Sequence, residues 1–188
     1  MGGVVETCDG YVVLQKRADW VAESQGCYDT PGGHAEPDEL KKSKSEKSTI
    51  DNVFNADDCD IVIELFHSFI REVRDEANIP ESSLSWPLLL GVNRNKQYGC
   101  KPGLVFYTQC SLSKEEVGAL YSQGGVEADE STEIKFIQTR DLVDANMDDF
   151  LLLTTNMAPL GQLALALFVY HYKKLHIAGK SLLKSRNC

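Results

Sequence analysis

The chain has 188 residues, of which 43% are hydrophobic and 25% are charged. This composition is typical of a globular domain with a hydrophobic core, and it excludes disordered, collagenous and coiled-coil proteins. The 28 acidic residues outnumber the 19 lysines and arginines, which gives a net charge of -9. A surface of that charge repels nucleic acid and anionic lipid, so an anionic ligand would need a counter-cation at its site, most simply a divalent metal ion.

Six cysteines are scattered along the chain without a C-x-x-C pair, which indicates reduced thiols rather than a disulfide framework. The first ten residues lack the basic start and the long apolar run of a targeting peptide. The longest apolar stretch, residues 157–170, contains Pro159 and Gly161 and is too short to cross a bilayer. These features predict a cytoplasmic protein without a membrane anchor.

The first half of the chain begins with two β-rich runs, at 4–7 and 11–17, which predict a hairpin because a D-G turn signal separates them. The segment DTPGGHAEP at 29–37 has two glycines and two prolines, which exclude both a helix and a central strand. Residues 38–60 are first rich in lysine and serine and then acidic, so they predict a solvated insertion.

A helical period begins near Asp60. The apolar residues that follow it fall at positions i, i+3, i+4, i+7 and i+11, namely Phe66, Phe69, Ile70, Val73 and Ala77. One of the acidic residues at 57, 58 and 60 can cap the start of this helix. Asn78 followed by Pro80 predicts its end, because asparagine tolerates the left-handed conformation and proline cannot continue the helix.

The second half of the chain predicts strands at 87–92 and 104–110, separated by a polar loop. A short helix with a serine cap is expected from 113 to 121, and an acidic loop then leads to a strand at 134–138. A final helix is expected from 158 to 175. Strands and helices alternate irregularly, which indicates a mixed sheet in an α+β protein built as an α/β/α sandwich.

Three carboxylates share one face of the first predicted helix. At about 100° per residue, Glu72 and Glu76 lie about 40° apart, with Asp75 beside them. Like charges four residues apart destabilise a helix by a few tenths of a kcal/mol, unless a cation or a neighbouring arginine such as Arg71 or Arg74 offsets the repulsion. Taken alone, this cluster is also typical of a solvated acidic face with local ion pairs.

The turn TPGGHAEP and the segment REVRDEANI together resemble the signature of the Nudix hydrolases, G-x5-E-x7-R-E-U-x-E-E-x-G-U, in which U is apolar. Six residues take signature positions: Arg71, Glu72, Val73, Asp75, Glu76 and Ile79. Asp75 replaces a glutamate, Asn78 replaces the glycine, and the insertion separates Gly33 from the helix. The upstream glutamate position falls on Ile63, with Glu64 one residue later.

Further segments are similar to the Nudix branch that hydrolyses UDP-glucose and UDP-galactose; they are ELFHSFI, PLLLGVNRN, VFYTQCSLS, and YSQGG followed by DEST. The likeness runs from Val4 to about Tyr172, which implies one Nudix-type domain at 1–176, with the insertion at 38–60 and a C-terminal tail at 177–188. Relatives in that branch carry a further N-terminal region, and we expect its absence to expose a sheet edge that a homodimer would cover.

The resemblance implies hydrolysis of UDP-sugars to UMP and a sugar 1-phosphate, dependent on Mg²⁺ or Mn²⁺. Glu72 and Glu76 would bind the metal, with Asp75 and the backbone carbonyl of Gly33 as further ligands. Arg71 would orient the carboxylates through charge-assisted hydrogen bonds.

The resemblance also implies a general base on a distant loop, for which we choose Glu130 from the acidic loop that also contains Glu127 and Asp129. Glu72 or Glu76 would activate the water in the alternative mechanism. His34 and Arg94 are the candidate contacts to phosphate or sugar.

Two other functions are also compatible with the sequence. The signature indicates diphosphate chemistry but leaves the flanking groups undefined, so ADP-ribose or a coenzyme is an alternative substrate. The departures from the signature also agree with a catalytically silent Nudix-like module that binds nucleotides.

Overall fold

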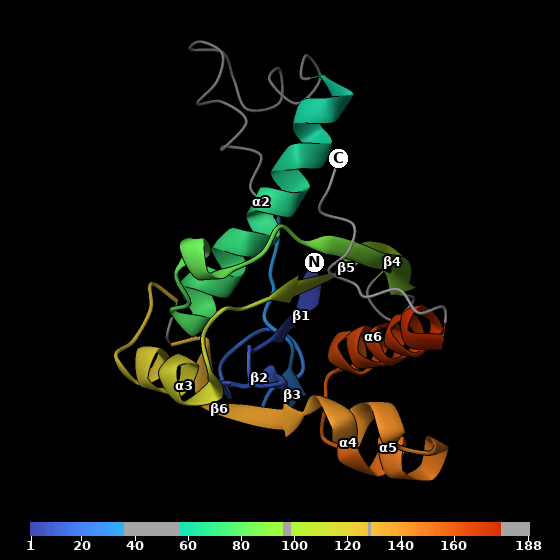
Figure 1. Cartoon of the computed structure of the whole chain (residues 1–188). Coiled ribbons are helices and arrows are strands. Elements are labelled where there is room, and N and C mark those ends of the chain that lie inside the picture. The colour runs from blue at the N-terminus through green and yellow to red at the C-terminus, as the bar shows by residue number, and fades with distance from the viewer. Residues whose placement is uncertain (36–56, 96–98, 128, 178–188) are drawn as a thin grey trace, which may run out of the picture.

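The computed structural model describes residues 1–35, 57–95, 99–127 and 129–177. Of the predicted insertion at 38–60, only residues 57–60 lie within these ranges. Of the predicted tail at 177–188, only residue 177 does. Within the described chain, a six-stranded sheet lies between helices (Figure 1). The strands are β1 (Gly2–Glu6), β2 (Tyr11–Arg17), β3 (Tyr28–Asp29), β4 (Leu88–Asn95), β5 (Lys101–Gln109) and β6 (Ser131–Gln138).

The sheet is mixed, as the sequence predicts, because β1 runs parallel to β5 and antiparallel to β2. Strand β1 is internal in the order of the described sheet: it pairs with β5 along its whole length and with β2 where Glu6 lies opposite Val12. The order β3-β2-β1-β5-β4 ends at β3 and at β4, and β6 pairs with β2 outside this order. The predicted hairpin of the first two strands is confirmed.

The hairpin of β4 and β5 is longer than the sequence predicts. The polar segment after residue 92 continues the strand ladder, with Asn93 opposite Gly103 and Arg94 opposite Pro102. The prediction of a loop at Asn93 and Arg94 was therefore wrong. The ladder joins backbone groups whatever the side chains are, and an edge strand tolerates polar residues that reach solvent.

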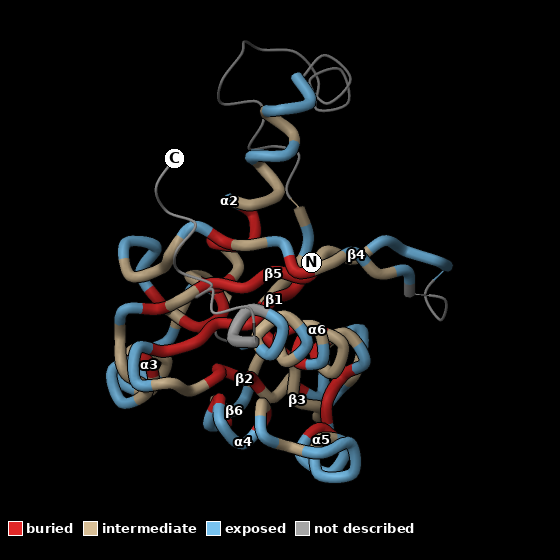
Figure 2. The backbone as a smooth tube through the Cα atoms, turned by 45° about the vertical axis from the view of Figure 1, so that its right-hand side comes forward, coloured by how far each residue is buried: buried red, intermediate tan, exposed pale blue. Residues whose placement is uncertain are grey.

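Different helices cover the two faces of the sheet, which gives the α/β/α sandwich. Helices α2 (Asp58–Ala77) and α3 (Lys114–Ser122) contribute to the core on one face, in which Phe69 is fully buried. Helix α6 (Pro159–Ile177) packs on the other face, where Phe168 is fully buried. Side chains alternate between the two faces along each strand, so β1, β2 and β5 contribute to both cores. Buried residues are concentrated along these strands (Figure 2).

Two short helices, α4 (Thr139–Asp144) and α5 (Met147–Leu153), follow β6 and are not predicted by the sequence. Their six and seven residues are too few to show a helical period. A single 3₁₀ turn, η2 (Glu81–Ser83), comes after α2. Among the helices described, none is both long and apolar enough to pass through a membrane.

Both ends of α2 follow from its sequence. The side chain of Asp57 accepts a hydrogen bond from the backbone N–H of Cys59 and caps the first turn. At the other end, Asn78 has φ 55°, in the left-handed region, and its side-chain amide donates to the carbonyl of Leu120 over 2.7 Å. The predicted helix is thus confirmed, with its end fixed by a residue that also connects it to α3.

Replacing Asn78 tests this helix end. We expect Asn78→Ala to lower the free energy of unfolding by about 1–2 kcal/mol, because alanine is strained in the left-handed region and loses the bond to Leu120. Urea denaturation followed by circular dichroism measures the change. Asn78→Gly, which relieves the strain but also loses the bond, should cost less. Equal losses in both variants would contradict the role of the backbone conformation.

Candidate active site

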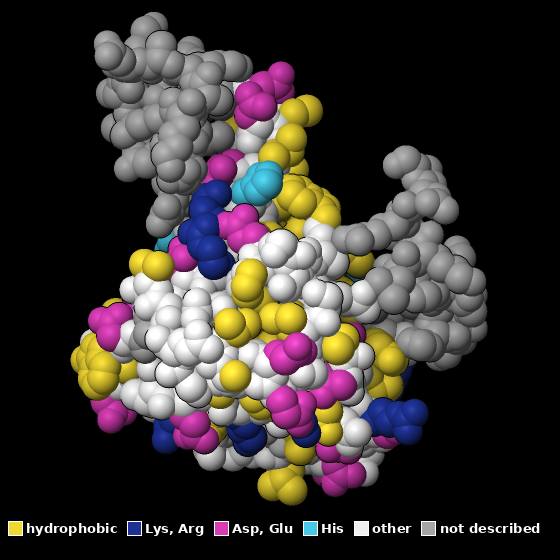
Figure 3. All heavy atoms as spheres, turned by 60° about the vertical axis from the view of Figure 1, so that its left-hand side comes forward, with side chains coloured by type: hydrophobic (Ala, Val, Ile, Leu, Met, Phe, Trp, Pro, Cys, Tyr) yellow, Lys and Arg dark blue, Asp and Glu magenta, His cyan; other side chains and the backbone are white. Residues whose placement is uncertain are grey.

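The Gly-Gly turn lies against α2, although the insertion separates the two in sequence. The backbone N–H of Gly32 donates to Glu76 Oε2, and the backbone N–H of His34 donates to Glu72 Oε1, each over 2.9 Å. A four-residue spacing places both carboxylates on the side of α2 that faces the turn. Acidic and arginine side chains gather where α2 meets the body of the molecule (Figure 3).

The two glycines are required by close packing. A Cβ at Gly33 would overlap both carboxylate oxygens of Glu72, and a Cβ at Gly32 would overlap the backbone of Met1 and Gly2. Any larger residue would therefore push the turn away from α2 or move Glu72. The turn and Glu72 therefore form one packed unit.

Burial sets the protonation of Glu76, which is only 8% exposed. The pKa of Glu76 is raised to about 8, chiefly by desolvation; the charges of Glu72, Glu130 and Asp29 contribute to the rise, while the bond from Gly32 opposes it. A carboxylate with such a pKa is mostly protonated at neutral pH unless a cation lies beside it. A divalent ion would reverse the shift, because it favours the charged form.

The donor set fits a hard divalent cation. The part of the chain that the structure describes holds no cluster of three or more His, Cys, Asp or Glu side chains arranged for a metal. However, Mg²⁺ in enzymes is commonly held by one or two carboxylates together with waters and substrate phosphates. The ammonium group of Met1 donates to the carbonyl oxygen of Gly33. Burial lowers the pKa of this ammonium group, whereas the charges of Glu72 and Glu76 oppose the shift, so the two carboxylates favour a cation at this position and burial disfavours it.

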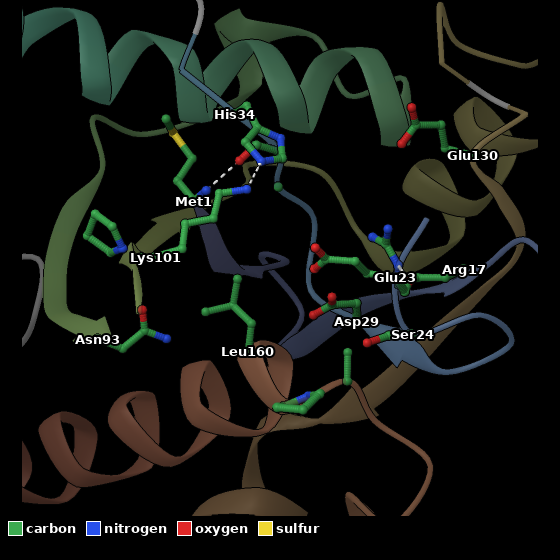
Figure 4. A pocket seen from close by; sticks show the side chains of 16 residues that line it. Met1, Arg17, Glu23, Ser24, Asp29, His34, Asn93, Lys101, Glu130 and Leu160 are labelled. Carbon is green, nitrogen blue, oxygen red and sulfur yellow. Dashed lines mark hydrogen bonds between the residues drawn. The ribbon is translucent and has the colours of Figure 1, made fainter. Parts of the chain in front are cut away.

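A cavity of about 190 Å³ opens beside the turn (Figure 4). Gly32, Gly33 and His34 form part of its wall, and Glu130 reaches it from the loop before β6. The backbone of Glu130 is held on both sides: its carbonyl accepts from Ala18 N–H over 2.9 Å, and its N–H donates to the carbonyl of Glu127 over 3.0 Å. The structure thus brings five predicted site residues together: Glu72, Glu76, Gly33, His34 and Glu130.

Sequence comparisons agree with this arrangement. Uridine diphosphate glucose pyrophosphatase NUDT22 of Homo sapiens is 40% identical over 142 residues, which cover 76% of this chain and 45% of that protein. Nudix hydrolase 9 of Arabidopsis thaliana is 32% identical over 141 residues, which cover 75% of this chain and 45% of that protein. The chain is a homologue of Nudix hydrolases. It spans just under half the length of these relatives.

No protein-family model matches the chain. Among solved structures, an Ap4A hydrolase of C. elegans superimposes with a TM-score of 0.49 and 12% identity, over 95% of this chain and 97% of that chain. The homodimer expected from the sequence gains no support from these relatives.

Two residues at Nudix signature positions, Arg71 and Asp75, make other contacts. Arg71 forms an ion pair with Glu64 and donates to Ser68 Oγ over 3.0 Å. Glu64, one residue after the expected upstream glutamate, thus pairs with the signature arginine, while Ile63 is 48% exposed. Asp75 receives two hydrogen bonds from Arg74, at 2.7 and 2.8 Å. Its role as a metal ligand stays a prediction.

The cavity also contains residues that the Nudix signature does not indicate. Arg17, Asp29, Asn93 and Lys101 line it, whereas Arg94 is exposed and is not part of the described lining. The period of two along a strand is the signal that separates Asn93 from its neighbour Arg94. This period can be used only when Asn93 and Arg94 are known to lie in a strand, and their polar sequence does not indicate one.

Asp29, at one end of this cavity, has a structural role because it binds backbone N–H groups. It accepts hydrogen bonds from the backbone N–H groups of Thr30, over 2.9 Å, and of Gly161 in the first turn of α6. A carboxylate is favoured there by the helix dipole. Burial nevertheless raises the pKa of Asp29 to about 6, with the charge of Arg17 opposing the shift.

Proposed function

We propose that this chain hydrolyses the diphosphate bond of UDP-sugars, such as UDP-glucose and UDP-galactose, to UMP and a sugar 1-phosphate in a Mg²⁺-dependent reaction. The observation that best supports a Nudix-type site is the contact of Glu72 and Glu76 with the Gly-Gly turn beside a cavity. The substrate class is supported by the name of the human relative, to which 76% of this chain aligns.

Glu72 and Glu76, together with the carbonyl of Gly33, are the groups that would hold the metal. When bound, a divalent ion neutralises phosphate charge and polarises a phosphoryl oxygen towards attack. The net charge of -9 would otherwise oppose the binding of a diphosphate. Asp75 adjoins this pair in sequence, and its carboxylate is held by Arg74.

Glu130 is our candidate for the general base. Its backbone is anchored by Ala18 and Glu127, and its exposed side chain stands at the wall of the cavity. Glu130 would take the proton of the attacking water as the bridging P–O bond breaks, and the leaving phosphate keeps the bond electrons. The second candidate for this proton is Glu72 or Glu76, each of which accepts a hydrogen bond from the turn at residues 32–34.

The same features support a cytoplasmic enzyme for small nucleotide sugars rather than for nucleic acid. The acidic surface disfavours a polyanion. Five cysteines within the described ranges are free, as is usual in reducing compartments.

A substrate panel tests the function directly. UDP-glucose, UDP-galactose, ADP-ribose and coenzyme A are incubated with the protein and Mg²⁺ or Mn²⁺, and products are separated by chromatography. We expect UMP and a hexose 1-phosphate from the two UDP-sugars, complete loss of turnover with EDTA, and recovery with added Mg²⁺. Cleavage of another diphosphate with UDP-glucose intact would show a different specificity.

A binding module without turnover is the second candidate, because exposed Ile63 takes the place of the signature glutamate. In that case, calorimetry would detect binding of UDP-glucose while chromatography finds no product.

A further inference from the structure

Lys101 lies at the start of β5 and reaches across the cavity to the Gly-Gly turn (Figure 4). Its Nζ atom is 2.5 Å from Nε2 of His34. The backbone N–H of His34 in turn bonds Glu72, so Lys101 and the acid pair lie on either side of the same short turn. A cation from the β4–β5 hairpin is thereby brought close to the proposed site of bond cleavage.

The contact leaves most of the hydrogen-bonding capacity of Lys101 unused. A lysine ammonium has three donors and no acceptor, so Nε2 of His34 must be the acceptor in this pair. An imidazole that accepts a hydrogen bond is neutral, and it therefore does not cancel the charge of Lys101. Two N–H donors and a full positive charge remain for a ligand in the cavity.

The two other cations of the described cavity wall are also engaged. The ammonium group of Met1 donates to the carbonyl oxygen of Gly33. Arg17 donates from Nε to the carbonyl of Glu23 over 2.9 Å, and its charge stabilises the ionised form of the buried Asp29. The carboxylates of Glu23, Asp29 and Glu130 also lie along this wall. The side of the cavity near Lys101 is therefore better suited to an anion than the side near Arg17.

We propose that Lys101 is a substrate-binding residue that contacts a phosphate oxygen of the diphosphate. This inference rests on the proposed function, since it assigns a residue to the same site. Lysine is well suited to the task as a compact, strongly charged donor on a flexible stem. Lys101 then supplies a positively charged side chain close to the metal-binding carboxylates.

Steady-state kinetics with UDP-glucose and Mg²⁺ test the proposal through Lys101→Met and Lys101→Arg. We expect Lys101→Met to raise KM about tenfold, the effect of losing one charged hydrogen bond, and to change kcat by less than about threefold. Lys101→Arg should restore most of the affinity. Lys114→Met is the matched control, because Lys114 contacts the Tyr11 ring and Glu115 and is not part of the described cavity lining.

The outcomes separate the inference from the proposed function. If the wild-type protein cleaves UDP-glucose and Lys101→Met has an unchanged KM, the inference is wrong and the function stands. If the wild-type protein binds UDP-glucose without cleaving it, calorimetry supports the inference when Lys101→Met binds about tenfold more weakly and overturns it when the affinities are equal. Failure of the wild-type protein both to bind and to cleave overturns the two together.

Discussion

Glu76→Gln is expected to lower the rate of UDP-glucose hydrolysis by at least about 100-fold, because a bound metal contributes several kcal/mol to the transition state and this substitution removes a charged ligand. Glutamine keeps the size of the side chain and an oxygen that can accept from Gly32, so the turn should stay in place. The rate is measured at saturating Mg²⁺ with purified variants.

Stability should change in the opposite direction from activity in this variant. In metal-free protein, the folded state holds the proton of Glu76 up to about pH 8, whereas the unfolded chain loses it near pH 4.5. The folded state therefore binds more protons between these values, and the free energy of unfolding falls as pH rises from 4.5 to 8. Glu76→Gln removes this contribution, so it should be more stable than wild type at pH 8.

Urea denaturation in EDTA at pH 5 and pH 8 measures this difference. The gain of Glu76→Gln over wild type should be larger at pH 8 than at pH 5. A variant that is less stable than wild type at both pH values would show that Glu76 serves the fold and not a buried site that prefers a cation.

Gly33→Ala should lower activity by about 10- to 100-fold, an effect of the size seen when the groups that orient a metal ligand are changed. The added methyl group would overlap the carboxylate of Glu72, so the carboxylate or the turn must move. Kinetics at increasing Mg²⁺ measure the loss, and a higher Mg²⁺ requirement is expected together with it.

Gly118→Ala is the matched control. Gly118 lies within α3, and a Cβ there would meet only Phe136 at an ordinary 3.8 Å. This variant should retain full activity and gain about 0.5–1 kcal/mol of stability from helix propensity. Wild-type activity in Gly33→Ala would contradict the close contact between the turn and Glu72.

The elements with strong local signals were predictable from the sequence. The period of apolar residues, the cap at Asp57 and the left-handed end at Asn78 define α2, and they also place Glu72 and Glu76 on one face. The signature then indicated which turn this face would meet. These features depend on residues close together in the chain, and for that reason one sequence suffices to recognise them.

Tertiary structure decided the features that depend on distant partners. The ladder through Asn93 and Arg94 exists because β5 lies beside β4, although neither residue has a strong strand preference. The ion pairs of Arg71 with Glu64 and of Arg74 with Asp75 are local to α2, but the signature does not indicate them, because alternative partners lie at similar spacings on the same helix.

The sequence by itself determined the acidic helix face, the glycine turn and the class of fold, since each follows from local periodicity or composition. Only the folded chain decided which residues surround the cavity. Lys101 and His34 are 67 positions apart, and Asp29 bonds Gly161 in the first turn of α6. Such contacts arise from sheet pairing and helix packing over long separations, which no local pattern encodes.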